Sequence, residues 1–338
     1  MSLASPNDPL AGLPIALTLG DPAGIGPEIV VKLHDAGLRA PCIVYGDLNA
    51  LARAAQMLGI SLDIVPLEGI PNPNLLNTAP GRLLVRPTSP TLPGDLALGR
   101  VDARAGRSAY DALCMAIDDA MAGRVRAIVT APLNKESMHA AGLDFPGHTE
   151  ILALRSHTPH VAMMLVNNDL RVILATIHVA LAEVPRMLDV ELELRTIRMA
   201  WEACRGMGIR NPRVAVAGLN PHAGENGKFG REDLDIIVPA IAQARALGID
   251  ASGPWPGDTV FMRARRGEFD IVVAQYHDQG LIPIKYLGVD EGVNVTVGLP
   301  FVRTSVDHGT AFDIAGRGIA DPSSLQTAFD LALKMTNR

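Results

Sequence analysis

The chain has 338 residues, of which 48% are hydrophobic and 20% charged, and this is typical of a globular protein long enough for two domains. Only 4% of the residues are aromatic, so Ala, Val, Ile and Leu must build the cores, as in buried parallel sheets covered by helices. The 30 basic and 36 acidic residues give a net charge of −6, which argues against nucleic acid and anionic membranes as partners. A small anionic ligand held by a local group of cations stays possible.

The three cysteines, Cys42, Cys114 and Cys204, are widely spaced and lie in apolar stretches. This pattern predicts buried free thiols and favours neither a disulfide framework nor a CxxC metal site. No stretch approaches the roughly 18 uninterrupted apolar residues of a membrane span. Residues 1–12 also lack the basic start and apolar core of a signal peptide. We therefore expect a cytoplasmic protein.

Apolar runs of strand length alternate along the chain with stretches of helical periodicity, which predicts an α/β fold with parallel strands. In chain order we expect a strand at 13–19, a strand at 42–45, a helix at 48–58, a helix at 106–122, strands at 127–130, 161–166 and 171–177, a helix at 190–207, a strand at 213–218, a helix at 231–246, strands at 271–275 and 293–297, and a helix at 322–335.

Three connections need separate comment. Gly20–Glu28 predicts a loop that enters a helix, with Pro27 in the first helical turn, where its missing N–H is not needed. Residues 66–98 are rich in Pro, Gly and Asn, which predicts a surface excursion and no core element. Ala131–Lys135 follows the carboxyl end of a predicted strand, where open α/β sheets bind ligands.

Three of the nine histidines directly follow apolar runs: His178, His222 and His277. Imidazoles at the strand ends of one sheet could converge on a divalent cation, because neutral imidazole is a common ligand of zinc-like metals. The alternative is that each histidine is a separately satisfied polar residue at a strand end. Taken singly, each histidine fits that alternative at least as well.

Two further groups of side chains suggest an anion site. His148 and Thr149 lie in a Gly-Pro turn that enters a helix, where free backbone N–H groups attract anions. Otherwise, Thr149 caps this helix and His148 is exposed. Lys285, Asn294 and Arg303 lie near strand and helix ends and could clamp carboxylate or phosphate. Singly, each of these three also fits a solvated surface group.

Six sequence blocks together resemble the 4-hydroxythreonine-4-phosphate dehydrogenase family of pyridoxal phosphate biosynthesis, including its threonate and erythronate 4-phosphate dehydrogenase branch. The blocks occur in family order and span nearly the whole chain: Gly20–Glu28, Thr130–Lys135, Pro146–Glu150, Gly218–Glu225, Tyr276–Gly280 and Arg303–Thr310. Any one block alone would be weak evidence, whereas six in order are highly specific.

The resemblance implies a fold similar to that of isocitrate and isopropylmalate dehydrogenases, with two α/β/α domains and a cleft between them. We expect residues 1–135 and 304–338 to form the first domain, and 136–303 to form a second domain with the metal ligands and the dimer interface. The resemblance also implies a homodimer whose subunits share active sites. Family members bind NAD without a Rossmann fingerprint, and Gly20–Glu28 indeed lacks the G-x-G-x-x-G pattern.

The resemblance implies a role for eight residues, and all eight positions hold the residue type of the family. The divalent metal, which could be Zn, Mg or Co, is assigned to His178, His222 and His277. The phosphorylated substrate is assigned to His148, Thr149, Lys285, Asn294 and Arg303.

The family reaction oxidises a secondary alcohol β to a carboxylate, passes a hydride to NAD (or NADP), and then releases CO2. The metal lowers the pKa of the alcohol and acts as an electron sink during decarboxylation. A base must remove the hydroxyl proton, and Asp258, Asp278 and Lys285 are candidates that the sequence does not rank. Asp258 could alternatively cap a helix that starts near Thr259.

The resemblance favours 4-phosphohydroxy-L-threonine as substrate and 3-amino-2-oxopropyl phosphate as product. Oxidation of D-threonate or D-erythronate 4-phosphate in sugar-acid catabolism is the second hypothesis, and a terephthalate dihydrodiol dehydrogenase-like activity ranks lower. The same α/β architecture also hosts acyl transfer to phosphate and ligand binding without catalysis, because fold does not fix function. Three strand-end histidines serve neither of these last two roles obviously.

Overall fold

The computed structural model describes residues 10, 12–71, 76, 81–88, 90–287 and 292–337. The chain divides into two compact units, one of residues 1–161 with 299–338 and one of residues 162–298. These boundaries differ from the expected ones at 135/136 and 303/304, because the helices of residues 135–155 and the strand Val302–Val306 belong with the first unit.

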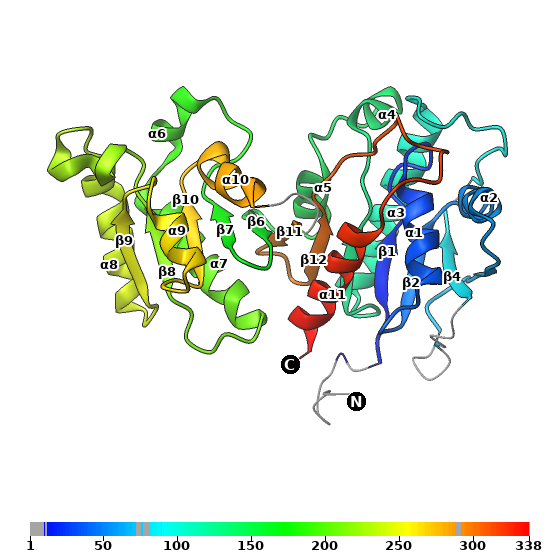
Figure 1. Cartoon of the computed structure of the whole chain (residues 1–338), viewed down its shortest axis with the longest axis horizontal. Helices are drawn as coiled ribbons and strands as arrows, with labels where there is room; N and C mark the ends of the chain where they lie inside the picture. The colour runs from blue at the N-terminus through cyan, green and yellow to red at the C-terminus, as the bar shows by residue number, and fades with distance from the viewer. Residues whose placement is uncertain are drawn as a thin grey trace. The chain divides into compact units, whose positions relative to one another are not determined.

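The first unit contains a wholly parallel sheet in the order β3-β4-β2-β1-β5-β12. Its elements in chain order are β1 (Ile15–Thr18), α1 (Gly26–Asp35), β2 (Cys42–Gly46), α2 (Leu48–Leu58), β3 (Asp63–Pro66), β4 (Arg82–Pro87), α3 (Ala103–Met121), β5 (Ala127–Thr130), α4 (Lys135–Ala140), α5 (His148–Arg155), β12 (Val302–Val306) and α11 (Ser323–Thr336). The helix α3 packs on β1, β2 and β5, whereas α11 packs on β12 and β5 and contacts α1 (Figure 1).

The second unit contains a mixed sheet in the order β11-β6-β7-β10-β8-β9, in which β6 is antiparallel to both neighbours and the last four strands are parallel. Its elements are β6 (Ala162–Val166), β7 (Arg171–Leu174), α6 (Val184–Met187), α7 (Val190–Gly206), β8 (Val214–Ala217), α8 (Val238–Ala246), β9 (Ala251–Trp255), α9 (Val260–Arg265), β10 (Ile271–Ala274), α10 (His277–Tyr286) and β11 (Val293–Val297). The helices α7 and α8 pack together, whereas α9 and α10 share an apolar cluster with β7, β8 and β10.

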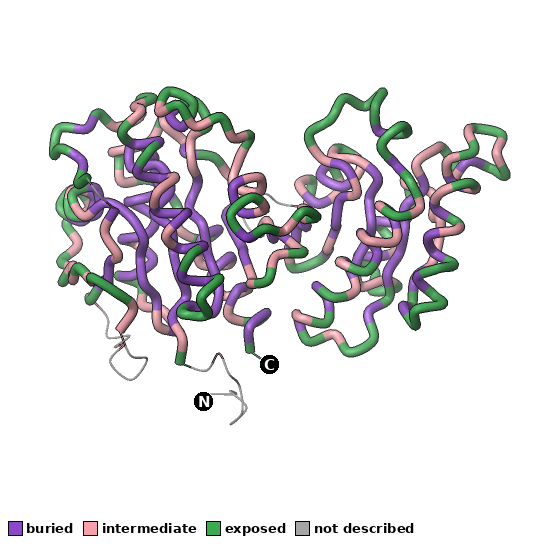
Figure 2. The backbone as a smooth tube through the Cα atoms, turned by 180° about the vertical axis from the view of Figure 1, so that it is seen from behind, coloured by how far each residue is buried: buried purple, intermediate pink, exposed green. Residues whose placement is uncertain are grey.

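The central strands of both sheets are buried, as Figure 2 shows. The four residues of β1 and the four of β10 are all buried, which is why these strands read as uninterrupted apolar runs. Local signals end the helices where expected. The Asp47 side chain accepts a hydrogen bond from the Ala50 N–H at the start of α2, and Gly59 ends that helix with a left-handed φ of 67°.

All the strands and helices predicted from periodicity are present, within a few residues of their expected ends. The prediction for residues 66–98 is wrong in part, because β4 lies inside this range, pairs with β2 and β3, and buries Leu83 and Val85. Prolines and glycines around this strand hid it. The strands β3, β9 and β12 were also not predicted, since each is short and contains polar or proline residues.

The structure confirms that Cys42, Cys114 and Cys204 are buried free thiols. Among the residues that the structure describes, no helix is both long and apolar enough to cross a membrane.

A glycine contact between α3 and α4 provides a stability test. A Cβ atom added at Gly106 would lie 2.2 Å from the backbone carbon of Ser137, whereas one added at Gly206 of α7 would meet nothing within 4 Å. Gly106→Ala should lower the free energy of unfolding by about 1 to 3 kcal/mol through overpacking. Gly206→Ala should leave it unchanged or raise it by up to about 1 kcal/mol through helix propensity. Urea unfolding midpoints measure both, and equal midpoints for the two variants would contradict the packing argument.

Candidate active site

Three adjacent parallel strands of the second unit each lead to one of the predicted metal ligands. His178 follows β7, His277 follows β10, and His222 follows β8, and the sheet order places β10 between the other two. The carboxyl ends of parallel strands meet at one edge of the sheet, so the three histidines lie at the same edge, with His277 as the first residue of α10.

His178 and His277 are brought together, with ring centroids 5.9 Å apart. The Nδ1 atom of His277 lies 2.7 Å from Oδ1 of Asp278. An ionised carboxylate can only accept, so Nδ1 of His277 donates in such a pair, and in the neutral imidazole Nε2 is then the nitrogen with a free lone pair. A histidine ligand of a metal is commonly held by a carboxylate in this way.

His222 lies in the turn Pro221–Gly227, which has left-handed φ values from His222 to Asn226. Its ring contacts Phe229 at a centroid distance of 6.2 Å. In the part of the chain that the structure describes, no group of three His, Cys, Asp or Glu side chains is close enough to hold a metal ion. A single chain therefore juxtaposes two of the three predicted ligands.

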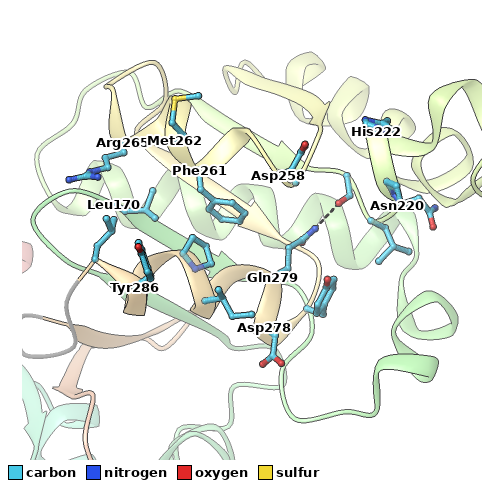
Figure 3. A pocket seen from close by; sticks show the side chains of 18 residues that line it. Leu170, Asn220, His222, Asp258, Phe261, Met262, Arg265, Asp278, Gln279 and Tyr286 are labelled. Carbon is cyan, nitrogen blue, oxygen red and sulfur yellow. Dashed lines mark hydrogen bonds between the residues drawn. The ribbon is translucent and has the colours of Figure 1, made fainter.

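A cavity of about 910 Å³ opens beside these loops in the second unit. Its lining combines polar groups with apolar and aromatic side chains, and it includes His222, Asp258, Asp278, Gln279, Phe261 and Tyr286 (Figure 3). A large apolar cavity with a few converging polar groups is the usual form of a ligand site.

The three candidate bases occupy different settings. Asp278 is exposed and is hydrogen-bonded to His277, so its carboxylate is already engaged. Asp258 is exposed at the cavity and does not cap α9, which starts at Val260 after Thr259, so the capping alternative is wrong. Lys285 is half-buried in the last turn of α10.

The first unit carries a second group of predicted residues near the end of β5. His148 and Thr149 open α5, and the residue before them, Gly147, provides no side-chain cap. Thr149 is therefore not the helix cap, contrary to the alternative considered from the sequence. Both side chains are half-buried beside the uncapped N–H groups of the first turn.

Arg303 lies within β12 and is only 2% exposed, so it is not a solvated surface group. Its Nη2 atom donates a hydrogen bond to Oγ1 of Thr130 at 2.7 Å. Burial lowers the pKa of Arg303 to about 9, so the guanidinium stays cationic at neutral pH. Burial and then the Arg303 charge hold the pKa of His148 well below its ordinary value, so that imidazole is neutral. Arg303 thus supplies the positive charge of this group.

Asn294 lies in β11, opposite Leu165 of β6, in the second unit. Its Oδ1 atom is buried, and none of the described residues offers it a hydrogen-bond partner. A buried acceptor without a partner is costly unless a ligand or water satisfies it, which fits a contact to substrate.

The two α/β units have the class of fold seen in isocitrate dehydrogenases, and this fold by itself does not fix an activity. The isocitrate dehydrogenase of Methylococcus capsulatus shares the fold with a TM-score of 0.50 at 15% identity, covering 95% of this chain and 85% of that one. The family model described as pyridoxal phosphate biosynthetic protein PdxA matches residues 38–332. The chain belongs to this family, which confirms the resemblance seen in the six sequence blocks.

The relatives agree with this assignment. A 4-hydroxythreonine-4-phosphate dehydrogenase from Beijerinckia indica is 55% identical over 95% of both chains. A D-threonate 4-phosphate dehydrogenase from Salmonella typhimurium is 48% identical over 95% of this chain and 98% of its own length. A crystal structure of 4-hydroxythreonine-4-phosphate dehydrogenase from Klebsiella pneumoniae has a TM-score of 0.87 at 43% identity, over 96% of this chain and 99% of that one.

Sequence reasoning missed several polar residues beneath the histidine loops, among them Asp233, Gln275 and Glu193. Glu193 of α7 is fully buried, and burial raises its pKa to about 8. The Gln275 side chain partly opposes this shift, and the charges of Asp233 and Asp189 reinforce it. Glu193 follows an acidic stretch typical of a solvated helix start, so no local signal marked it as buried.

Glu193 makes stability depend on pH. Its folded pKa of about 8 exceeds the ordinary value of 4.5, so its stabilising contribution is complete below pH 4.5 and is lost as pH rises through 8. Glu193→Gln stays neutral, so its free energy of unfolding relative to the native sequence should rise by several kcal/mol over this pH range. Urea unfolding at both ends of the range measures the change. Glu191→Gln, on the exposed side of α7, is the matched control, and a parallel response of both variants would refute the assignment.

Proposed function

We propose that the chain catalyses the NAD-dependent oxidation of 4-phosphohydroxy-L-threonine and its decarboxylation to 3-amino-2-oxopropyl phosphate, a step of pyridoxal phosphate biosynthesis in the cytoplasm. Family membership and the relative from Beijerinckia indica support the reaction. The structural observation that carries the proposal is the juxtaposition of His178 and His277 at adjacent strand ends, with His277 held by Asp278. The three buried free cysteines fit a reducing compartment.

The proposed metal ligands are His178, His222 and His277, and Zn, Mg or Co are candidate ions. A neutral His277 that donates from Nδ1 to Asp278 has its Nε2 atom available for coordination, which supports a nitrogen-rich divalent site. When bound, such a cation supplies a Lewis acid that favours ionisation of the substrate alcohol. Asp278 orients His277, which leaves Asp258 and Lys285 as the stronger candidates for the base.

The proposed substrate contacts are His148, Thr149, Lys285, Asn294 and Arg303. The buried guanidinium of Arg303 suits a carboxylate or phosphate, because a fork of N–H donors matches either group. His148 is neutral and can donate or accept a hydrogen bond without adding charge. NAD is the proposed hydride acceptor, with NADP as the alternative.

Oxidation of D-threonate or D-erythronate 4-phosphate remains the second candidate function. It is favoured by the 48% identity to the Salmonella typhimurium enzyme over nearly the whole chain. The same histidines and the same anion contacts would serve this reaction.

A substrate screen tests the proposed function. Metal-free protein resupplied with Zn²⁺, Co²⁺ or Mg²⁺ should form NADH with 4-phosphohydroxy-L-threonine, and removal of the ion should abolish turnover. The rate with threonate 4-phosphate and erythronate 4-phosphate, measured by the same absorbance change, separates the two candidates. Higher kcat/KM for a sugar-acid phosphate would select the second function. Silence with all three phosphorylated substrates would reject both.

We further propose that the enzyme is a homodimer with shared active sites. Large apolar side chains around the cavity are exposed in the single chain, with Tyr286 at 89%, Ile282 at 66% and Met262 at 44%. A contiguous apolar surface of this kind commonly marks a protein interface. A two-fold axis would give each dimer two equivalent sites.

Complementation tests the shared site. His178→Ala and Arg303→Ala should each be inactive, and mixing the two after dissociation should restore about a quarter of the native activity. The reason is that about half the dimers are then heterodimers, each with one intact and one doubly damaged site. If heterodimers form without recovery, both residues act in a site built from one chain.

A further inference from the structure

Asp233 is a fully buried carboxylate at the start of the helical turn Asp233–Ile237 that leads into α8. Its Oδ1 atom accepts a hydrogen bond from the Leu219 N–H at 2.9 Å. Its Oδ2 atom accepts bonds from the Asn220 N–H at 3.2 Å and from Nδ2 of Asn220 at 3.0 Å. A carboxylate away from water needs such donors. One side chain thus holds the segment that leads from β8 to His222.

Two glycines let the loop wrap closely around this carboxylate. A Cβ atom at Gly218 would lie 2.8 Å from Oδ1 of Asp233, and one at Gly224 would lie 3.2 Å from Oδ2. The loop therefore contacts the same side chain both before and after His222, so the position of His222 depends on Asp233 from two directions.

The loop also needs an external support, because its backbone is unfavourable by itself. The φ values are 54° at His222, 52° at Ala223 and 41° at Glu225. Left-handed backbone costs an L-residue roughly 1 to 2 kcal/mol, and it persists where the surrounding structure holds it. The hydrogen bonds from Leu219 and Asn220 to Asp233 provide such support at the start of the loop.

Gln279 connects the same segment to the helix of a second histidine. Its Nε2 atom donates to the Gly218 carbonyl at 2.7 Å, as Figure 3 shows, and its Oε1 atom accepts from the Gln275 N–H at 2.7 Å. Gln279 belongs to α10, whose first residue is His277. The end of β8 is thereby tied to the start of α10 on one side and to Asp233 on the other.

We propose that Asp233 is a positioning residue that holds the left-handed loop in the conformation in which His222 can act as a metal ligand. The inference rests on the proposed function, since it takes His222 as a ligand. A carboxylate is required at this position because three N–H donors face it, and an asparagine would place an NH₂ group against them.

Titration of the metal-free, full-length protein with Co²⁺ tests this role without relying on turnover. Asp233→Asn should weaken Co²⁺ binding by about 10- to 100-fold, the usual effect of losing an outer-shell partner. It should also alter the visible absorption of the Co²⁺-loaded protein, because the ligand geometry changes. Asp235→Asn is the matched control, since Asp235 lies in the same turn, is exposed and pairs with Arg231. It should bind Co²⁺ with the affinity and spectrum of the native protein.

His222→Ala separates this inference from the proposed function. If His222→Ala binds Co²⁺ as tightly as the native protein, the histidine site itself is wrong and the inference falls with it. If His222→Ala loses binding while Asp233→Asn keeps the native affinity and spectrum, the site stands and the positioning role is overturned. Should Asp233→Asn fail to fold, Asn220→Ala decides, because this half-buried side chain donates one bond to Asp233, and its other bond goes to Glu232. Severalfold weaker binding then supports the role, and unchanged binding refutes it.

Discussion

Parallel pairing of β7, β10 and β8 is the constraint on which the candidate active site depends. The registers join Val272 to Val172 and Ile271 to Val214, so the three strands run in the same direction. Reversal of any one strand would carry its histidine to the opposite edge of the sheet. The buried apolar side chains that hold the strands together therefore also determine which imidazoles can meet. Packing and chemistry are coupled through strand direction.

The sequence predicted well those features whose causes are local. The bounds of α2 followed from Asp47 at its start and Gly59 at its end, and both residues act in the structure as their chemistry suggests. Buried strands such as β5 and β10 were visible as short apolar runs. To predict that the three histidines lie at one edge of the sheet required only the positions of the strand ends and the expectation of parallel pairing.

Features with distant causes were not predictable in this way. The strand β12 contains Arg303 and Thr304, which are buried and donate hydrogen bonds to Thr130 and to the Ala328 carbonyl of other elements. The burial of Asp233 also depends on residues distant in the chain, because its N–H donors come from a loop that precedes it. In sequence it sits in an acidic stretch that resembles a solvated helix. Burial of a charge depends on its partners, and local sequence does not reveal them.

Substrate choice can change in this enzyme while the fold stays the same. The two leading substrates share a carboxylate, a hydroxyl at C3 and a phosphate at C4, and they differ at C2, where one carries an ammonium and the other a hydroxyl. A guanidinium recognises the shared anionic groups, so the proposed contact from Arg303 would not distinguish the two substrates at C2. Discrimination must come from side chains that face C2, because a carboxylate there favours the ammonium and a hydrogen-bonding pair favours the hydroxyl. A few contacts can thus decide the substrate within an unchanged fold.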